Sequence, residues 1–216
     1  KISRLGVITT RGFRDVLELG RRTRPKPYGM TGTFECLIPR ELRLEVSERI
    51  DSEGEILQAL DEAEVRNAVK TLLENGVESL VIHFLHSYKN NIHEKQAERI
   101  VRELWPNPVV TRGSALMTEY REYERGTTAS INAAVQPVLD HYISSLRDSL
   151  KNEGYSRDLL VMQGNGGTVS SRIVSEDAVK TVMSGPASGV MAAAFTAGKS
   201  GFSNVLTYDM GGTSCD

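Results

Sequence analysis

The stretch Ser79-Leu-Val-Ile-His-Phe-Leu85 decides the fold class, because it is an almost unbroken apolar run. Such a run is typical of a strand that is covered on both faces, as in a parallel sheet flanked by helices. Before it, residues 61–74 place Val65 and Leu72 on one helical face, and Gly76 stands where a C-terminal helix cap belongs. The sequence therefore predicts a helix that turns at a glycine into a buried strand.

The same alternation continues on both sides of this strand. Residues 92–104 form a second amphipathic pattern, which Pro106 ends, and residues 108–111 are predicted to be the next strand. Residues 5–9 are predicted to be a short strand near the other end of the chain. Helix and strand in alternation predict an α/β fold with right-handed crossovers between parallel strands.

The remaining predicted elements have less regular patterns. They are a helix at 12–19, a strand at 42–50, a long helix at 119–150, a short buried strand at 159–162, a small-residue helix at 186–197 and a strand at 204–210. Pro137 should kink the long helix or divide it into two, because proline removes a backbone donor and clashes with the preceding turn.

Composition excludes several classes of protein. The 216 residues are 39% apolar and 25% charged, so the chain can bury a core and is neither disordered nor fibrous. With 26 basic against 28 acidic residues, it lacks the field that drives nonspecific binding to nucleic acid or acidic membranes. Two distant cysteines, Cys36 and Cys215, and the lack of a long apolar run predict a soluble, cytoplasmic protein without a membrane span.

The segment 206–216, Leu-Thr-Tyr-Asp-Met-Gly-Gly-Thr-Ser-Cys-Asp, carries the strongest chemical signal. Asp209 closes an apolar strand, and two paired glycines follow it. Glycines let backbone N–H groups approach phosphate oxygens, hydroxyl groups can donate to them, and an aspartate can hold Mg²⁺ directly or through water. An ordinary hairpin turn is the alternative, because Asp and Gly also gather in turns for conformational reasons alone.

The preceding segment strengthens the phosphate interpretation. Ser184-Gly-Pro-Ala-Ser-Gly189 opens a helix of small residues that leads into the acid-tipped strand. Tight helix packing would explain these residues equally well. Together, the two segments resemble the connecting helix and second phosphate hairpin of the actin, sugar-kinase and heat-shock ATPase superfamily. This resemblance implies a ribonuclease H-like, actin-type ATPase fold.

Five motifs narrow the resemblance to one family. They are Thr9-Thr-Arg-Gly-Phe-Arg-Asp-Val-Leu-Glu-Leu-Gly-Arg21, Glu119-Tyr-Arg-Glu-Tyr-Glu-Arg125, Met162-Gln-Gly-Asn-Gly-Gly167, Ser184-Gly-Pro-Ala-Ser-Gly-Val190 and Asp209-Met-Gly-Gly-Thr-Ser214. Their order is similar to that of the hydantoinase A/5-oxoprolinase family, which includes N-methylhydantoinases and subunits of acetone and acetophenone carboxylases. The resemblance implies an ATP-dependent hydrolase, in which phosphate activates a cyclic amide such as a hydantoin or 5-oxoproline for ring opening.

The resemblance also implies domains, cofactors and site residues. Residues 1–112 would close the family's N-terminal domain, and residues 113–216 would begin its central hydantoinase A domain. ATP and Mg²⁺ are the implied cofactors, and a hydantoinase B-type subunit or domain is the implied partner, with self-association left open. Asp209 would be catalytic and would bind metal together with Asp216. The residues implied to contact the nucleotide are Asn165, Gly166, Gly167, Gly185, Gly189, Gly211, Gly212, Thr213 and Ser214.

Departures from the family pattern limit what this chain can do alone. The family's first Asp-x-Gly-Gly-Thr hairpin is absent, Gly164 stands in place of a small hydroxyl residue, and Cys215 stands in place of threonine. The chain also stops at Asp216, before the remaining nucleotide-binding elements. We therefore expect a fragment of a longer polypeptide that folds at least in part and shows no ATPase activity by itself.

Two other functions fit the same motifs. A ketone carboxylase subunit of this family would share the ATP machinery, so the motifs do not separate it from a cyclic-amide hydrolase. A nucleotide sensor or assembly scaffold would use the same cleft without catalysis, because fold alone does not fix function.

Other polar residues give weaker signals. His83 and His86 are three apart in or just after a strand and point to opposite faces, so we expect core or strand-end histidines rather than a metal pair. The charges of residues 119–125 predict a solvated helix face with ion pairs, although the family motif would give them a part in holding substrate. Cys215 has no base nearby in the sequence and is interpreted as a packing residue.

Overall fold

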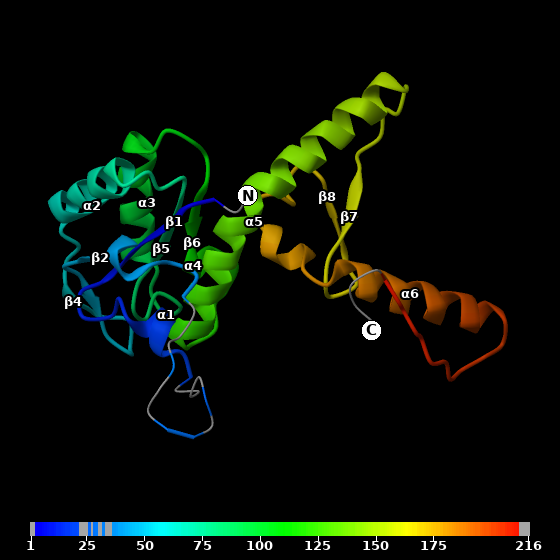
Figure 1. The fold of residues 1–216 in the computed structure, drawn as a ribbon, viewed down its shortest axis with the longest axis horizontal. Coiled ribbons are helices and arrows are strands. Elements are labelled where there is room, and N and C mark those ends of the chain that lie inside the picture. Colours follow the sequence, from blue (N-terminus) through cyan, green and yellow to red (C-terminus); the bar gives the residue numbers. More distant parts are fainter. Residues whose placement is uncertain (1–2, 22–25, 27, 30–31, 33–35, 212–216) are drawn as a thin grey trace. The chain divides into compact units, whose positions relative to one another are not determined.

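The computed structural model describes residues 3–21, 26, 28–29, 32 and 36–211 (Figure 1). The chain divides into two compact units, Lys1–Pro137 and Val138–Asp216, which we call unit 1 and unit 2. No helix in the described ranges combines the length and the apolar character needed to cross a membrane.

A four-stranded parallel sheet organises unit 1. Its strands run in the order β2 (Arg43–Val46), β1 (Leu5–Thr10), β5 (Ser79–His83) and β6 (Val110–Arg112). Every residue of β1 and β5 is buried, as expected for strands covered on both faces. The predicted α/β class and its parallel strands are confirmed.

Two helices of unit 1 form as their sequence patterns predict. In α2 (Glu62–Glu74), the Asp61 carboxylate caps the first turn by accepting from the Ala63 and Glu64 N–H groups at 2.9 and 3.0 Å. The chain leaves this helix through Gly76, whose φ of 70° suits glycine. The second helix, α3 (Ile92–Leu104), packs on α2.

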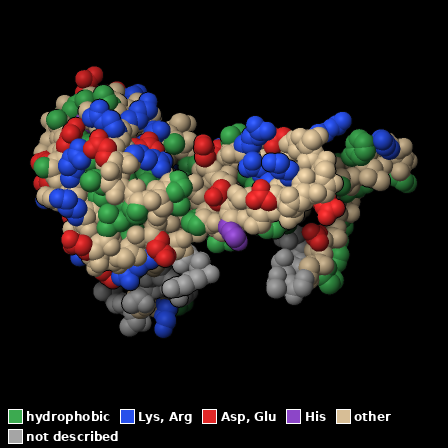
Figure 2. Space-filling view, turned by 90° about the horizontal axis from the view of Figure 1, so that it is seen from above, with side chains coloured by type: hydrophobic (Ala, Val, Ile, Leu, Met, Phe, Trp, Pro, Cys, Tyr) green, Lys and Arg blue, Asp and Glu red, His purple; other side chains and the backbone are tan. Residues whose placement is uncertain are grey.

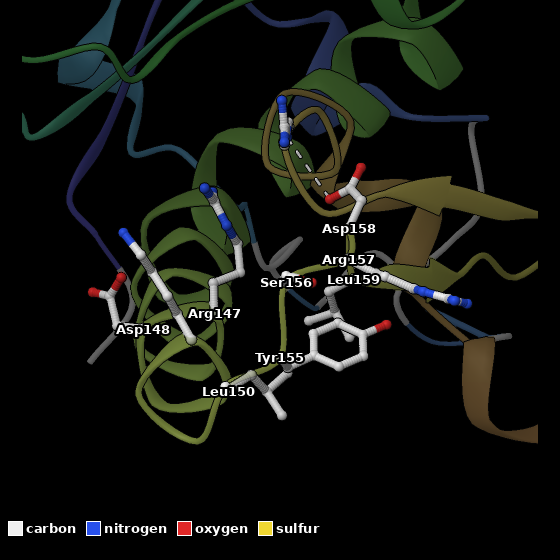
Figure 3. Close-up of a pocket in the computed structure, with 11 residues that line it drawn as sticks. Arg147, Asp148, Leu150, Tyr155, Ser156, Arg157, Asp158 and Leu159 are labelled. Carbon is white, nitrogen blue, oxygen red and sulfur yellow. Dashed lines mark ion pairs between the residues drawn. The ribbon is translucent and has the colours of Figure 1, made fainter.

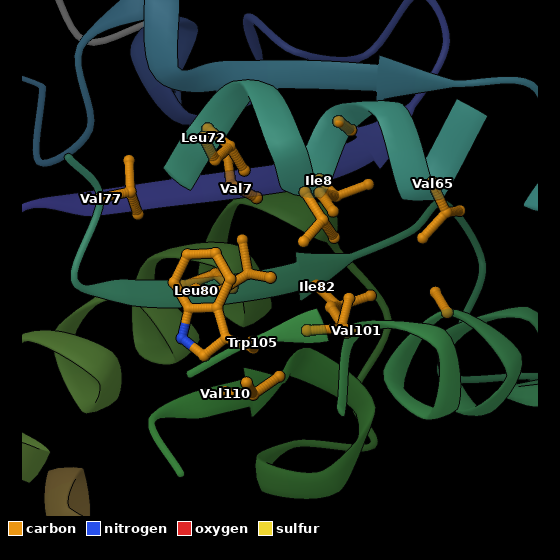
Figure 4. Packing of buried hydrophobic residues seen from close by; sticks show 14 of the residues in the cluster. Val7, Ile8, Val65, Leu72, Val77, Leu80, Ile82, Val101, Trp105 and Val110 are labelled. Carbon is orange, nitrogen blue, oxygen red and sulfur yellow. The ribbon is translucent and has the colours of Figure 1, made fainter. Parts of the chain in front are cut away.

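One hydrophobic core joins these elements (Figure 4). The figure shows Ile8, Leu80 and Ile82 of the sheet facing helix side chains such as Val65 and Val101. Close packing of this kind makes the core sensitive to the loss of even one methylene group.

Figure 2 shows acidic and basic side chains mixed over the visible face of unit 1, in keeping with the near-balanced net charge.

Some elements of unit 1 differ from prediction. The strand expected at 42–50 is divided into β2 and β3 (Arg49–Ile50), because β3 leaves the sheet and pairs with β4 (Ile56–Gln58). The helix expected at 12–19 is only α1 (Val16–Leu19). Short helical turns not expected from the pattern are η1 (Arg40–Leu42) and α4 (Gly113–Leu116).

The long helix α5 (Glu122–Asn152) begins in unit 1 and ends in unit 2. It continues through Pro137, so the helix is not divided there. Proline in a helix interior costs one backbone hydrogen bond and some strain, which the other turns of a 31-residue helix tolerate.

Unit 2 is built from a hairpin and a helix. Strands β7 (Leu160–Met162) and β8 (Thr168–Ser170) pair antiparallel, and η2 (Ala178–Thr181) leads to α6 (Ser184–Lys199). The α6 prediction is confirmed. Strand β7 is exposed or half-buried, so the prediction of a buried strand there is wrong.

The strand predicted at 204–210 is also wrong within the described residues. The chain there is extended without regular secondary structure, and only Met210 forms an isolated bridge. Leu206 is 97% exposed. A strand needs a hydrogen-bonded neighbour along its length, and an apolar, β-prone sequence does not by itself supply one.

Candidate functional site

The turn between β7 and β8, Gln163–Gly167, holds three of the predicted site residues. Gly166 takes a φ of 82°, which glycine adopts readily, and its N–H donates to the Gln163 carbonyl at 3.0 Å. The Asn165 side chain accepts from the Gly167 N–H at 2.9 Å. The turn is therefore held by its own hydrogen bonds, as in a preformed loop.

Close packing fixes this turn against the chain that precedes α6. The Gly164 N–H donates to the Lys180 carbonyl at 2.7 Å, and a Cβ at Gly164 would collide with the Val182 carbonyl oxygen. The departure at Gly164 thus has a physical reason in this chain. On the other side of the turn, a Cβ at Gly166 would lie 3.2 Å from Met191 Cγ of α6.

Helix α6 carries the next two predicted residues, Gly185 and Gly189. A Cβ at either position would meet open space, so no described element packs closely against them. No residue of α6 is buried. The helix starts after Met183, whose φ of 62° is unusual for a residue with a side chain.

Asp209 lies beside α6. Together with Gly189 it lines a cavity of about 430 Å³, whose other walls are Pro186, Val190, Ala193, Leu206, Thr207 and Tyr208. The structure thus brings Asp209 and Gly189 together, but no residue of the Gln163–Gly167 turn lines this cavity. Gly211 is described and exposed. The predicted residues Gly212, Thr213, Ser214, Cys215 and Asp216 lie outside the described residues.

The metal site predicted from the sequence consists of Asp209 and Asp216. In the described ranges, no three His, Cys, Asp or Glu side chains gather in a way that could hold a metal ion. Asp209 is exposed, and its predicted partner Asp216 falls in the part that is not described. Asp209 therefore offers carboxylate oxygens of the kind that Mg²⁺ prefers.

Unit 1 contains a buried polar network that sequence patterns did not reveal. The Thr10 hydroxyl donates to Glu48 and accepts from the Leu85 N–H at 2.9 Å. The other oxygen of Glu48 lies 2.7 Å from His93 Nδ1. These groups join the ends of β1 and β5 to α3, and only the unforeseen turn after β2 places Glu48 among them.

A second buried carboxylate, that of Glu94, connects two loops. One oxygen accepts from the Phe84 N–H at 3.0 Å and the other from the Ser114 N–H at 2.9 Å. Buried carboxylates persist when donors satisfy them, and Glu94 has one on each oxygen. We assign Glu94 a structural role.

His83 is a core histidine, as predicted. Its ring lies between two glycines, since a Cβ at Gly113 would be 3.2 Å from Nδ1 and a Cβ at Gly126 would be 2.8 Å from Cδ2. Burial, and secondarily the charge of Arg125, lowers the pKa of His83 to about 3. The ring is therefore neutral near pH 7, and its Nδ1 has no described partner.

The charged motif 119–125 is only partly the solvated face that the sequence predicts. Arg125 is fully buried and donates to the Glu119 carbonyl at 2.9 Å, the Phe84 carbonyl at 3.2 Å and the Glu122 carboxylate at 3.1 Å. The run of charges at the helix start does not indicate that Arg125 is buried. Only the tertiary fold places the end of β5 against the start of α5. For Arg125 the predicted exposure is wrong, while the predicted intrahelical ion pair is present, with Glu122. For Arg121 the prediction of exposure holds, because its side chain is 55% exposed.

A separate cavity of about 410 Å³ lies at the end of α5 in unit 2 (Figure 3). Arg147, Lys151 and Arg157 line it without an ion-pair partner among the described residues, and Arg172 pairs with Asp158 at 3.8 Å. In the figure, Arg147 and Arg157 extend in different directions. These cations are exposed, so water and salt screen any attraction for an anion.

Comparison with known proteins places this geometry in a family. The hydantoinase/oxoprolinase N-terminal region matches residues 1–105, and the hydantoinase/oxoprolinase model matches residues 125–216. An uncharacterized protein of Methanocaldococcus jannaschii is 41% identical over 97% of this chain, and the acetophenone carboxylase gamma subunit of Aromatoleum aromaticum is 34% identical over 99%.

A solved structure agrees. The crystal structure of the ATP-dependent caprolactamase from Pseudomonas jessenii matches the whole chain with a TM-score of 0.88 and 32% identity, over 32% of its own length. The chain spans 31% of the length of each of the two sequence relatives. Both halves of the chain match the same family and the resemblance inferred from the motifs is confirmed: the chain belongs to the hydantoinase/oxoprolinase family.

Proposed function

We propose that this chain forms part of an ATP-dependent enzyme that opens a cyclic amide, such as a hydantoin, 5-oxoproline or another lactam. One observation carries the proposal: two of the segments expected to face ATP contact the same helix, α6. Gly166 lies beside Met191, and Asp209 shares a cavity with Gly189. The similarity to an ATP-dependent caprolactamase supports the reaction class.

The described residues fit a phosphate-binding role at two places. In the Gln163–Gly167 turn, the N–H groups of Gly164, Gly166 and Gly167 already have protein acceptors. Among the described residues, donors of this turn without a protein acceptor include the Asn165 backbone N–H and side-chain amide, so Asn165 would contact phosphate. The start of α6, at Ser184 and Gly185, would add first-turn N–H groups and the favourable end of the helix dipole.

Asp209 would hold Mg²⁺ and orient the attacking group, with Asp216 as the second metal ligand. When bound, Mg·ATP would supply a phosphoryl group to the amide oxygen, which would activate the amide carbon for attack by water. The ring C–N bond would then break, the ring nitrogen would take up a proton, and phosphate would be released. Catalysis of this kind depends mainly on positioning and charge stabilisation. Asp209 is exposed and free to turn toward a ligand.

The proposal extends to fold and partner. We propose an actin-type ATPase fold, with residues 1–112 in one domain and residues 113–216 at the start of the next. A hydantoinase B-type subunit or domain would complete the enzyme. The name of one relative, acetophenone carboxylase gamma subunit, describes a component of a larger enzyme and is consistent with such a partner.

A ketone carboxylase subunit is the second candidate, because the same relative is a carboxylase and is 34% identical. The two functions differ in what stimulates ATP hydrolysis by the intact enzyme. We expect 5-oxoproline, hydantoin or caprolactam to raise phosphate release, while ketones with bicarbonate do not. The opposite pattern would replace the first candidate with the second, and slow turnover indifferent to every small molecule would indicate a sensor.

The matched variants for this assay are Asp209→Ala and Asp148→Ala. Asp209→Ala should abolish lactam-stimulated turnover. Asp148 is an exposed aspartate at the end of α5, away from the α6 cavity, and its loss should leave turnover unchanged. Wild-type turnover in Asp209→Ala would remove Asp209 from the mechanism.

A further inference from the structure

We propose that a third cavity, between α1 and the start of α5 in unit 1, binds the cyclic amide through Glu122 and Arg121. The cavity has a volume of about 710 Å³ and is lined by residues from both helices. This inference rests on the proposed function and deepens it by naming the residues that would hold the amide.

The Glu122 carboxylate is positioned for a ligand. Its Oε1 accepts from the His86 N–H at 3.2 Å and from Arg125 Nη2 at 3.1 Å. Both bonds end on the same oxygen, so Oε2 has no bond to another described residue. The Glu122 side chain lines the cavity and is 20% exposed. One oxygen is thus fixed by the protein, and the other is free to accept.

The backbone around Glu122 is strained. Arg121 has a φ of 85° and His86 a φ of 56°, in a region that residues with side chains seldom adopt. Such conformations persist when surrounding contacts impose them, and they gather at ligand sites. The fully buried Arg125 holds the residues next to both positions, because it donates to the Glu122 carboxylate and to the carbonyl of Phe84.

Buried polar atoms beside Glu122 lack partners. Arg125 Nε and His83 Nδ1 are buried without a hydrogen bond, and both residues are more than nine-tenths buried. Unpaired buried polar atoms are rare in folded proteins and need a reason, of which a functional site is one. Neither residue lines the cavity itself, but Arg125 is bonded to Glu122, which does.

The charge state of Glu122 suits an N–H donor. Burial raises the pKa of Glu122, but the His86 N–H and the Arg125 guanidinium together outweigh burial and hold this pKa below its usual value. The carboxylate is therefore ionised at neutral pH and can only accept hydrogen bonds. A ligand that contacts Oε2 must bring a donor.

The other residues that line the cavity offer hydrogen-bond donors and apolar surface. Arg21 and Arg121 both reach Glu124, at 2.6 and 3.8 Å, so one carboxylate is shared between two guanidinium groups with donors to spare. Phe13 and Tyr123 add aromatic surface. The cavity thus combines an acceptor, adjacent donors and an apolar wall.

A cyclic amide matches this arrangement. In a small ring the amide is cis, so its N–H and C=O lie side by side on one edge, whereas an open-chain amide is trans and directs them apart. The cis edge can donate to Glu122 and accept from Arg121 at the same time, while the ring methylenes contact Phe13 and Tyr123. The geometry therefore favours lactams and cyclic imides over open-chain amides.

The test compares lactam and ATP binding in the intact protein, by calorimetry with caprolactam and 5-oxoproline and with N-methylacetamide as the open-chain control. The variants are Glu122→Gln and Arg121→Gly, with Glu74→Gln as the matched control on an exposed residue outside the cavity. Because glycine tolerates a φ of 85°, Arg121→Gly should keep or raise the unfolding temperature, so its loss of binding is not a loss of fold.

We expect the lactam dissociation constant to rise at least tenfold in Glu122→Gln and Arg121→Gly. ATP binding by these variants, and lactam binding by Glu74→Gln, should be unchanged. Lactam-stimulated ATP turnover with unaltered lactam affinity in both variants would overturn this inference and leave the proposed function intact. A wild-type protein that binds ATP but no lactam would overturn both. Equal affinity for N-methylacetamide and caprolactam would overturn the cis-amide argument.

Discussion

Units 1 and 2 use apolar residues in opposite ways. In unit 1, Ile82 is fully buried in one continuous core. In unit 2, α6 buries none of its residues, and Phe195 is 64% exposed. Hydrophobic burial is the main favourable term in folding. The comparison teaches that the polar groups of unit 1 are positioned by a close-packed core. The predicted phosphate residues of unit 2 lie instead on or beside a helix that buries none of its own side chains.

The largest expected contrast comes from truncating one side chain in each unit. Ile82→Ala should lower the free energy of unfolding by about 4 kcal/mol, because it leaves a cavity in a close-packed core. Phe195→Ala should change it by no more than about 0.5 kcal/mol, because the ring is mostly exposed. Urea unfolding curves measure both. A large loss in Phe195→Ala would show that α6 is packed in solution in a way this structure lacks.

The next contrast is a pH effect on unit 1. The pKa of His83 is about 3 in the folded chain and near 6.5 when unfolded, so the unfolded state binds one more proton between these values. His83 should therefore cost stability as the pH falls from 6.5, by about 1.4 kcal/mol per pH unit, and by roughly 3 kcal/mol at pH 4.5.

Substitution isolates this effect. His83→Gln should flatten the decline in unfolding free energy between pH 6.5 and 4.5, measured by urea unfolding at each pH. His141→Gln, at an exposed histidine of unit 2, should leave the slope as in the wild type. An unchanged slope in His83→Gln would mean that His83 is not held neutral by burial.

Two helical glycines give the smallest contrast. A Cβ at Gly126 would lie 2.7 Å from Leu17 Cδ2 and 2.8 Å from His83 Cδ2, whereas a Cβ at Gly189 would meet open space. Gly126→Ala should cost about 1 kcal/mol, because overpacking exceeds the gain in helix propensity. Gly189→Ala should gain up to about 1 kcal/mol from propensity alone. Thermal unfolding measures both, and equal shifts would contradict the packing difference.

The sequence predicts unit 1 better than unit 2 for a physical reason. A strand such as 79–85, covered on both faces, leaves an unbroken apolar run that periodicity detects. Segment 204–210 has the same apolar character but no partner strand among the described residues, and pairing cannot be read from one segment alone.

The candidate sites divide in a similar way. Glycine-rich motifs point to Asn165 and Asp209 from sequence alone, since their residue types suit phosphate and metal. Arg125 and Glu122 are brought to the end of β5 by long-range packing, which leaves no local pattern in the sequence. The i,i+3 spacing predicts their ion pair, but only a structure shows that Glu122 lines a cavity.

The central claim is that phosphate activates the oxygen of a cyclic amide. The most direct measurement uses a lactam labelled with ¹⁸O in its carbonyl group, turned over by the intact enzyme with ATP, followed by mass spectrometry of the released phosphate. If the amide oxygen is phosphorylated and then leaves with phosphate, the phosphate carries one ¹⁸O for each ring opened. Unlabelled phosphate, with all the ¹⁸O in the ring-opened product, would contradict the account.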